Sequence, residues 1–301
     1  MPMPIQRRVL SIIHDPKIPL AGDRRLSAAL GWNDPDALAE RYIEDVRTCS
    51  HGLANYRVVD RIEVDGFPAK QDGFAYTPEA YWANWQRRSG WHKPDGVDYL
   101  RLVAEFDLLN RIAGDAIDEV WLFGGPYFGY YESIMGGPGA IPCNAPPLHG
   151  TEAAGRRFVI MGFNYERGVG EMLEDLGHRA EAILGHVYRN TSGPANLWER
   201  FTRHERSHPG QAECGNVHFA PNSVRDYDWG NPSPVVSRSR SWLSFPDLEA
   251  TARRENCAEW GDGDIRLHHL WWFRHFPHID GSADGVSWNW WEPIIAPETI
   301  T

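Results

Sequence analysis

A buried strand that runs directly into a long amphipathic helix is the feature that most constrains the fold of this chain. The strand is RRFVIMGFN (residues 156–164), an apolar run without alternation, and the helix is GVGEMLEDLGHRAEAIL (residues 168–184). A strand that is apolar throughout is expected to be buried on both faces, as in a sheet covered by helices. This segment therefore predicts a sheet with at least one helix packed on it.

The rest of the first 190 residues continues this pattern. We predict strands over residues 7–13, 55–67, 118–124 and 130–137. We predict helices over residues 34–51, 77–88 and 97–115. The strand YYESIMGG (130–137) is expected at the edge of the sheet, before a Gly/Pro-rich loop. Strands and helices in this order favour an α/β fold, a mixed sheet with packed helices.

After about Asn190 the sequence changes character. It becomes rich in Pro, Ser, Asn and Gly, and DIRLHHLWWFRHF (264–276) is the one convincing late helix. We therefore predict an α/β sheet domain over residues 1–190 that ends in the amphipathic helix. A loop-rich, Trp-rich C-terminal subdomain over residues 191–301 is expected to cover the polar face of that helix.

Composition excludes several classes of protein. Asp and Glu number 41 against 30 Lys and Arg, for a net charge of −11, which argues against a nucleic-acid partner. No apolar run reaches the 18 residues of a transmembrane helix. The early apolar run VLSII is too short for a signal peptide. The chain is expected to be cytosolic or a domain of a longer secreted bacterial protein, with a slight preference for the second.

The cysteine and tryptophan contents favour structural roles. The four cysteines form no CxxC pair, so a thiolate zinc site is not expected, and buried thiols are favoured over disulfides. The 14 tryptophans, several of them clustered, are expected first as core side chains. The alternative is that they stack on sugars or grip peptides.

The polar face of the predicted helix carries residues that can bind a metal ion. At about 100° per residue, one face opposite the apolar stripe collects Glu171, Glu174, Asp175, His178 and Glu181. Spacings of four and three residues place Glu174, His178 and Glu181 next to one another. In the alternative interpretation this face is ordinary surface. Gly177 argues against it, because a mid-helix Gly costs about 1 kcal/mol relative to Ala and its small size lets another segment approach.

The strand and helix resemble the active-site segment of the zincin metallopeptidases, whose helix carries His-Glu-x-x-His. The matching positions are Glu174, Asp175 and His178, in EDLGH. The order of elements over about residues 5–190 also resembles the upper zincin subdomain, where an edge strand borders the substrate cleft. The resemblance implies metal-dependent hydrolysis of peptide bonds, with a peptide added to the edge strand.

The chain departs from the zincin motif at two positions. Glu174 replaces the first ligand His, and Asp175 replaces the general-base Glu. The methionine turn of one zincin branch is also absent, because no Met follows Met172. The chain also resembles a bacterial protein group that shares this Trp-rich ending.

These patterns lead to one hypothesis for the site. Glu174 and His178 would bind a divalent metal, with zinc as the first candidate, and the third ligand would come from Glu181, His218 or His269 in that order. Asp175 or Glu171 would polarise the attacking water, and Tyr165 or a late His would stabilise the oxyanion. Residues of the edge strand and the late helix would contact a peptide or glycan substrate: Tyr131, Glu132, Trp271 and Trp272.

Two alternatives stay open from the sequence. One is a metal-free glycoside hydrolase with a carboxylate pair drawn from Glu132, Glu213 and Glu259. The other is a non-catalytic module that binds carbohydrate or peptide through the tryptophan clusters. No GxSxG, P-loop or GxGxxG motif points to a further class.

Overall fold

The computed structural model describes residues 2–249 and 251–300, which divide into two compact units. The sheet unit consists of Arg7–Tyr42 and Tyr56–Asp175. The C-terminal unit consists of residues 2–6, 43–55 and the described part of 176–300. Helices α2 (Pro35–Cys49) and α6 (Val169–Val187) each contribute to both units. The division thus falls inside α6, whereas the sequence places a boundary after residue 190.

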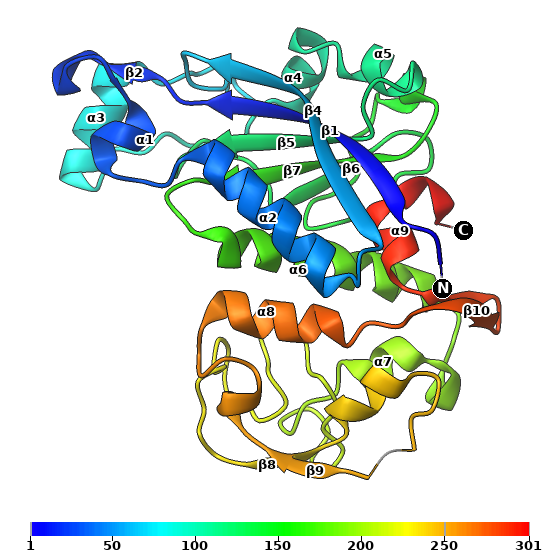
Figure 1. The fold of residues 1–301 in the computed structure, drawn as a ribbon. Helices are drawn as coiled ribbons and strands as arrows, with labels where there is room; N and C mark the ends of the chain where they lie inside the picture. Colours follow the sequence, from blue (N-terminus) through cyan, green and yellow to red (C-terminus); the bar gives the residue numbers. More distant parts are fainter. Residues whose placement is uncertain (1, 250, 301) are drawn as a thin grey trace. The chain divides into compact units, whose positions relative to one another are not determined.

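A five-stranded mixed sheet forms the sheet unit, in the order β4-β1-β5-β7-β6 (Figure 1). Its strands are β1 (Ile5–His14), β4 (Ala54–Val64), β5 (Glu119–Gly124), β6 (Ser133–Gly136) and β7 (Phe158–Asn164). β5 runs parallel to both β1 and β7, whereas β6 is antiparallel to β7 and lies last in the order. The predictions of an α/β fold and of an edge strand within residues 130–137 are therefore confirmed.

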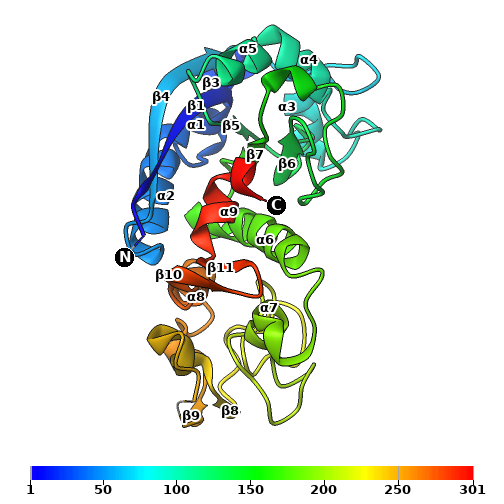
Figure 2. The ribbon, with the colours of Figure 1, turned by 90° about the vertical axis from the view of Figure 1, so that its right-hand side faces the viewer.

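One face of this sheet carries an apolar core shared with two helices. Helices α4 (Tyr99–Glu105) and α5 (Leu108–Ala113) lie close together beside the sheet in Figures 1 and 2. Their residues Leu102 and Ile112 belong to one cluster with Leu10 of β1, Leu122 of β5 and others. The sequence predicts one helix over 97–115, which is wrong in its middle. Asp107 has φ +50°, a left-handed conformation that an α-helix interior does not accept, so the helix divides there.

The opposite face of the sheet is aromatic. Tyr42 of α2 lies with its ring centroid 5.2 Å from both Trp121 of β5 and Phe163 of β7. The Trp121 indole N–H donates to the fully buried Glu119 carboxylate at 2.9 Å. The apolar sequence of β5 and β7 is thus explained, because both faces of these central strands are covered.

Local signals fix the starts of several helices. The Asp34 side chain accepts from Ala37 N at the start of α2. Thr77 accepts from Ala80 N at the start of α3 (Pro78–Arg87), followed by Pro78 as predicted. These caps satisfy backbone N–H groups that have no partner inside the helix. The small remaining elements of the sheet unit are β2 (Lys17–Ile18), β3 (Arg24–Arg25) and α1 (Leu26–Leu30).

The C-terminal unit is built from short elements around an aromatic core. Its helices are α7 (Leu197–Phe201), α8 (Ile265–Arg274) and α9 (Trp291–Ile295). Its strands form two hairpin-like pairs, β8 (Val235–Ser237) with β9 (Arg253–Glu255) and β10 (His278–Ala283) with β11 (Val286–Asn289). Figure 2 shows α7 and α8 near the β10–β11 pair.

Aromatic rings fill the interior of this unit. The Phe201 ring lies 5.0 to 5.8 Å from those of Trp242, Trp272, Phe276 and Trp290. All five side chains are essentially inaccessible to solvent. The structure thus places these tryptophans in a core, which the sequence analysis ranks first among their roles. All four cysteines keep their thiols, as predicted. Among the described helices none is long and apolar enough to cross a bilayer.

His14, at the end of β1, makes the stability of the sheet unit depend on pH. Its ring is 2% exposed, the Tyr130 hydroxyl lies 2.8 Å from Nδ1, and burial lowers its pKa from 6.5 to about 4. Between these two pH values the unfolded chain binds the extra proton, so the free energy of unfolding falls as the pH is lowered. We expect a loss of roughly 2 kcal/mol from this group between pH 7 and pH 5. Urea unfolding of the wild type and of His14→Gln at both pH values measures it, and an equal pH dependence in both proteins would contradict the prediction.

Candidate metal centre

Helix α6 presents its acidic and imidazole side chains opposite a buried apolar stripe. Met172, Leu173, Leu176, Ala180, Ile183 and Leu184 of this helix are all buried. Glu174 and His178 lie one turn apart on the other side and are partly buried. The heptad-like spacing of apolar residues fixes this rotation of the helix, as the sequence predicts.

A segment from far along the chain packs on the polar face of α6 at Gly177. A Cβ atom at this position would lie 2.6 Å from Cγ2 of Val217, closer than any side chain tolerates. The backbone N–H of Val217 donates to Glu181 Oε1 at 3.1 Å. Gly177 is therefore required for the close approach, and residues beyond 190 do reach this face of the helix.

The approach of Val217 brings His218 against His178. Their ring centroids are 4.8 Å apart, with the ring planes nearly perpendicular at 87°. Possible ligand atoms of Glu174, His178 and His218 all lie within 4.8 Å of one another. Across residues 2–249 and 251–300, this is the one group of three or more His, Cys, Asp or Glu side chains close enough to share an ion.

Each imidazole of this group is held by its own carboxylate. Nδ1 of His178 donates to Glu181 Oε2 at 3.2 Å, and Nδ1 of His218 lies 3.1 Å from Asp226 Oδ1. A carboxylate on Nδ1 fixes the tautomer and leaves Nε2 as the metal-binding atom, which is the usual outer shell of a histidine ligand. Glu181, a predicted ligand, bonds to His178 Nδ1 and Val217 N and lies outside the Glu174–His178–His218 group.

The residues fit a divalent ion after a small contraction. One carboxylate and two imidazoles are a donor set found in catalytic zinc sites, which bind at about 2.1 Å and therefore hold their ligand atoms about 3.4 Å apart in tetrahedral geometry. In the structure the ligand atoms of the three residues lie up to 4.8 Å apart, which exceeds the tetrahedral spacing by about 1.4 Å. Rotation of partly buried side chains on α6 and on the 216–218 segment can supply this contraction.

Tyr227 borders the group and was missed by the sequence analysis, as was Asp226. The Tyr227 hydroxyl lies 3.1 Å from His218 Nε2, and the residue is 54% exposed, so its side chain can rotate away when Nε2 binds an ion. Its backbone φ is +56°, in the left-handed region that a bulky residue rarely adopts. The acidic and aromatic run RDYDWG (225–230), soon after His218, is the only sequence signal that indicates this pair.

Asp175, next to Glu174, is partly buried among acidic groups. Burial, together with the charges of Glu132, Glu174 and Glu171, raises its pKa well above the ordinary value for Asp. A bound cation would act against these effects, because a local positive charge favours the carboxylate form.

Three predicted site residues have structural partners elsewhere. Glu171 Oε2 accepts from Gly168 N at 3.1 Å and so caps the start of α6. The buried Tyr165 hydroxyl donates to the His14 carbonyl at 3.0 Å, which corrects its assignment to the oxyanion. His269 is fully buried in α8, and its Nδ1 donates to Ile265 O at 2.7 Å. His269 lies outside the Glu174–His178–His218 group.

The residues predicted to contact a substrate differ in how far they are exposed to solvent. Trp272 is fully buried, and its N–H donates to Gly215 O at 3.0 Å, so no face of its ring is open to a ligand. Trp271 is partly exposed and packs at 4.5 Å on His275. Tyr131 is 39% exposed and stacks with Tyr99.

The outer edge of β6 is covered by the chain's own loop. The carbonyls of Ser133 and Met135 accept from Ala145 N at 3.2 Å and Leu148 N at 2.9 Å. The Glu132 carboxylate accepts from Asn144 Nδ2 at 2.7 Å. A peptide therefore cannot add to this strand at residues 133–135, which corrects the expectation that β6 offers an open edge.

Comparison with known proteins gives no relative from which to transfer a function. The chain matches no family model, no curated protein and no solved structure.

Proposed function

We propose that this protein is a metal-dependent hydrolase whose ion is held by Glu174, His178 and His218. The observation that carries the proposal is that possible ligand atoms of Glu174, His178 and His218 lie within 4.8 Å of one another, while Nδ1 of each imidazole lies next to a separate carboxylate, that of Glu181 or Asp226. Histidines that bind metals almost always donate their other ring N–H to a carboxylate, a carbonyl or water, and both imidazoles of this group have such a carboxylate.

The surrounding side chains suit hydrolysis. A divalent ion bound here would lower the pKa of a water molecule toward neutrality and polarise a substrate carbonyl. Asp175, adjacent to Glu174 on α6, is the group we propose to take the proton from the attacking water. Tyr227, exposed beside His218, is the group we propose to donate a hydrogen bond to the charge that develops on the substrate oxygen.

A peptide is the substrate class that the zincin resemblance implies. The parallel strand β7 leads into α6, and the antiparallel strand β6 lies beyond it at the edge, which supports this layout. Because the loop 144–148 covers β6, we propose that a substrate binds without adding to residues 133–135.

The two alternatives receive less support. Glu213 is buried and bound to both Arg200 and Trp242, and Glu259 pairs with Arg240, so neither is poised as a glycosidase carboxylate. The tryptophans with the largest side-chain burial, among them Trp121, Trp242, Trp272 and Trp290, line cores and offer no binding platform.

Metal analysis and a hydrolysis assay test the proposal together. Purified protein is loaded with zinc, manganese or calcium, dialysed and analysed for metal. We expect about one equivalent of one ion and cleavage of a mixed peptide library that a chelator stops and the ion restores. Less than about 0.1 equivalent of every ion would contradict the metal centre. One equivalent with no cleavage of peptides, esters or glycosides would contradict the hydrolase.

A further inference from the structure

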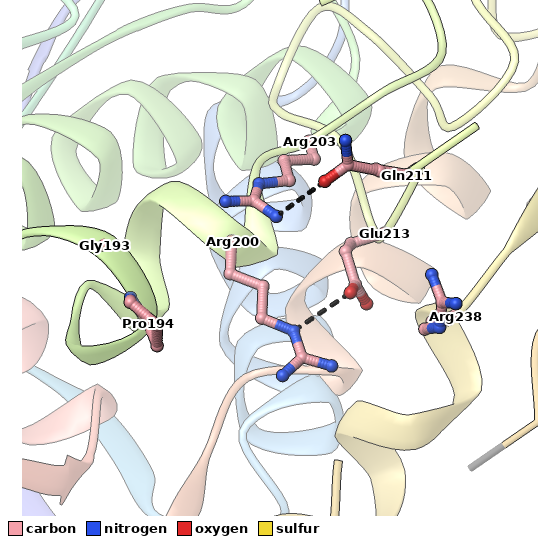
Figure 3. Close-up of a pocket in the computed structure, with 7 residues that line it drawn as sticks. All are labelled: Gly193, Pro194, Arg200, Arg203, Gln211, Glu213 and Arg238. Atoms are coloured by element: carbon pink, nitrogen blue, oxygen red, sulfur yellow. Dashed lines mark hydrogen bonds and ion pairs between the residues drawn. The ribbon is translucent and has the colours of Figure 1, made fainter. Parts of the chain in front are cut away.

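A pocket in the C-terminal unit, separate from the Glu174–His178–His218 group, is lined by three arginines (Figure 3). Its volume is about 310 Å³, and its lining residues are Gly193, Pro194, Arg200, Arg203, Gln211, Glu213 and Arg238. This volume lies within the range of small-molecule sites. Three guanidinium groups around one pocket are unexpected in a chain whose net charge is −11.

Glu213 anchors the floor of this arginine pocket. The Glu213 side chain is 4% exposed, and its two oxygens accept from Arg200 Nε at 3.0 Å and from the Trp242 indole at 3.1 Å. Arg200 Nη2 donates to Leu248 O at 3.0 Å. The Arg200 side chain is therefore fixed by two bonds, while Nη1 has no partner among the described residues. Figure 3 shows the Arg200 guanidinium near the Glu213 carboxylate, with Arg238 on the other side of that carboxylate.

Two further donors in the pocket lack a protein partner. Arg203 bonds Gln211 Oε1 through Nη1, and its Nη2 lies 3.8 Å from Glu199 Oε1, but its Nε is buried without an acceptor in the part of the chain that the structure describes. Arg238 is exposed, and its guanidinium contacts no carboxylate among residues 2–249 and 251–300. A buried donor without an acceptor costs about 1–3 kcal/mol of folding free energy, and more when the donor is charged, as a guanidinium is. The unpartnered Nε of Arg203 therefore indicates that a ligand supplies the missing acceptor.

We propose that the arginine pocket binds a phosphate group, either as inorganic phosphate or as the phosphomonoester of a small metabolite. The lining side chains carry three positive charges and the negative charge of Glu213, and the half-exposed Glu199 carboxylate lies 3.8 Å from Arg203 Nη2. The three arginines therefore exceed the neighbouring carboxylates by one charge. A phosphate dianion uses both this excess charge and the unpartnered N–H groups, because it presents three strong acceptor oxygens where a carboxylate presents two. Guanidinium forks also match phosphate oxygens in pairs of parallel hydrogen bonds.

Titration calorimetry with sodium phosphate and phenyl phosphate at pH 8 tests this site, with ionic strength held constant by sodium chloride. We expect saturable binding of both phosphates at millimolar or lower concentration, and binding of acetate at least about tenfold weaker. Arg238→Gln is expected to raise the Kd for phosphate about tenfold, the effect of one charge-assisted hydrogen bond. Arg238 is exposed, so this variant is expected to fold.

Two controls locate the binding. Arg101→Gln removes an exposed arginine of α4 in the sheet unit and is expected to leave the Kd unchanged. His178→Ala removes a proposed metal ligand and is also expected to leave the Kd for phosphate unchanged. Phosphate binding that is lost in His178→Ala but kept in Arg238→Gln would overturn the assignment of phosphate to the arginine pocket. Acetate binding as tight as phosphate, or heats no larger than those of chloride, would also overturn it. None of these results bears on the metal centre, which is tested by metal content.

Discussion

His178→Ala is expected to abolish stoichiometric metal binding and any metal-dependent hydrolysis. The variant removes one of the three proposed ligands, the α6 imidazole that packs against His218, and leaves only Glu174 and His218 in the group. Loss of an outer-shell partner alone costs 10–100-fold in metal affinity, so loss of a ligand is expected to cost at least about 100-fold. Metal content after dialysis and competition titration against a chelator measure the effect.

Comparing variants of His178 and of Glu181 distinguishes a metal ligand from the carboxylate that bonds to it. Glu181→Gln keeps the shape of the side chain but weakens its bond to His178 Nδ1, and we expect a loss of about 10–100-fold in metal affinity. His149→Ala, which changes an exposed histidine of the sheet unit, is the matched control and is expected to bind metal normally. Equal metal binding in all three variants would refute the assignment of His178 as a ligand.

Trp272→Ala is expected to destabilise the protein by about 3–5 kcal/mol, the usual cost of removing a large aromatic side chain from a core. The Trp272 ring is inaccessible to solvent, lies 4.7 Å from the Phe276 ring and 5.8 Å from Phe201, and donates its N–H to Gly215 O. Because Gly215 lies just before the 216–218 segment, the variant is also expected to loosen the position of His218. Urea unfolding measures the stability, and metal titration of the folded fraction measures the second effect.

The neighbouring tryptophan provides the comparison. Trp271→Ala is expected to cost less, since part of its ring is already in contact with water. A larger loss of stability from Trp271→Ala than from Trp272→Ala would contradict the packing described here.

Local patterns predicted much of the sheet unit. The unalternating apolar strands β5 and β7 were recognisable because both of their faces are covered, and Asp34 and Thr77 cap α2 and α3 as short-range signals require. The break between α4 and α5 was not predicted. It depends on the left-handed backbone of Asp107, which the apolar spacing across residues 97–115 does not reveal.

The sequence pattern also could not predict which of two adjacent side chains is buried. Trp271 and Trp272 differ by about 100° around α8, and only the packing of that helix decides which ring enters the core. The loop that covers β6 was expected as a Gly/Pro segment, but its hydrogen bonds to Ser133 and Met135 follow from its path in space.

By itself, the sequence determined that Glu174 and His178 share the polar face of one helix, because the 3.6-residue period fixes the face of every residue in α6. The tertiary structure alone decided that His218, in place of Glu181 or His269, completes the group, with Asp226 next to His218 Nδ1 and Tyr227 next to its Nε2. Residues 178 and 218 are joined by chain with little periodicity, so no local rule sets the distance between them. Packing of Val217 against Gly177 sets that distance, and such a contact exists only once the chain has folded.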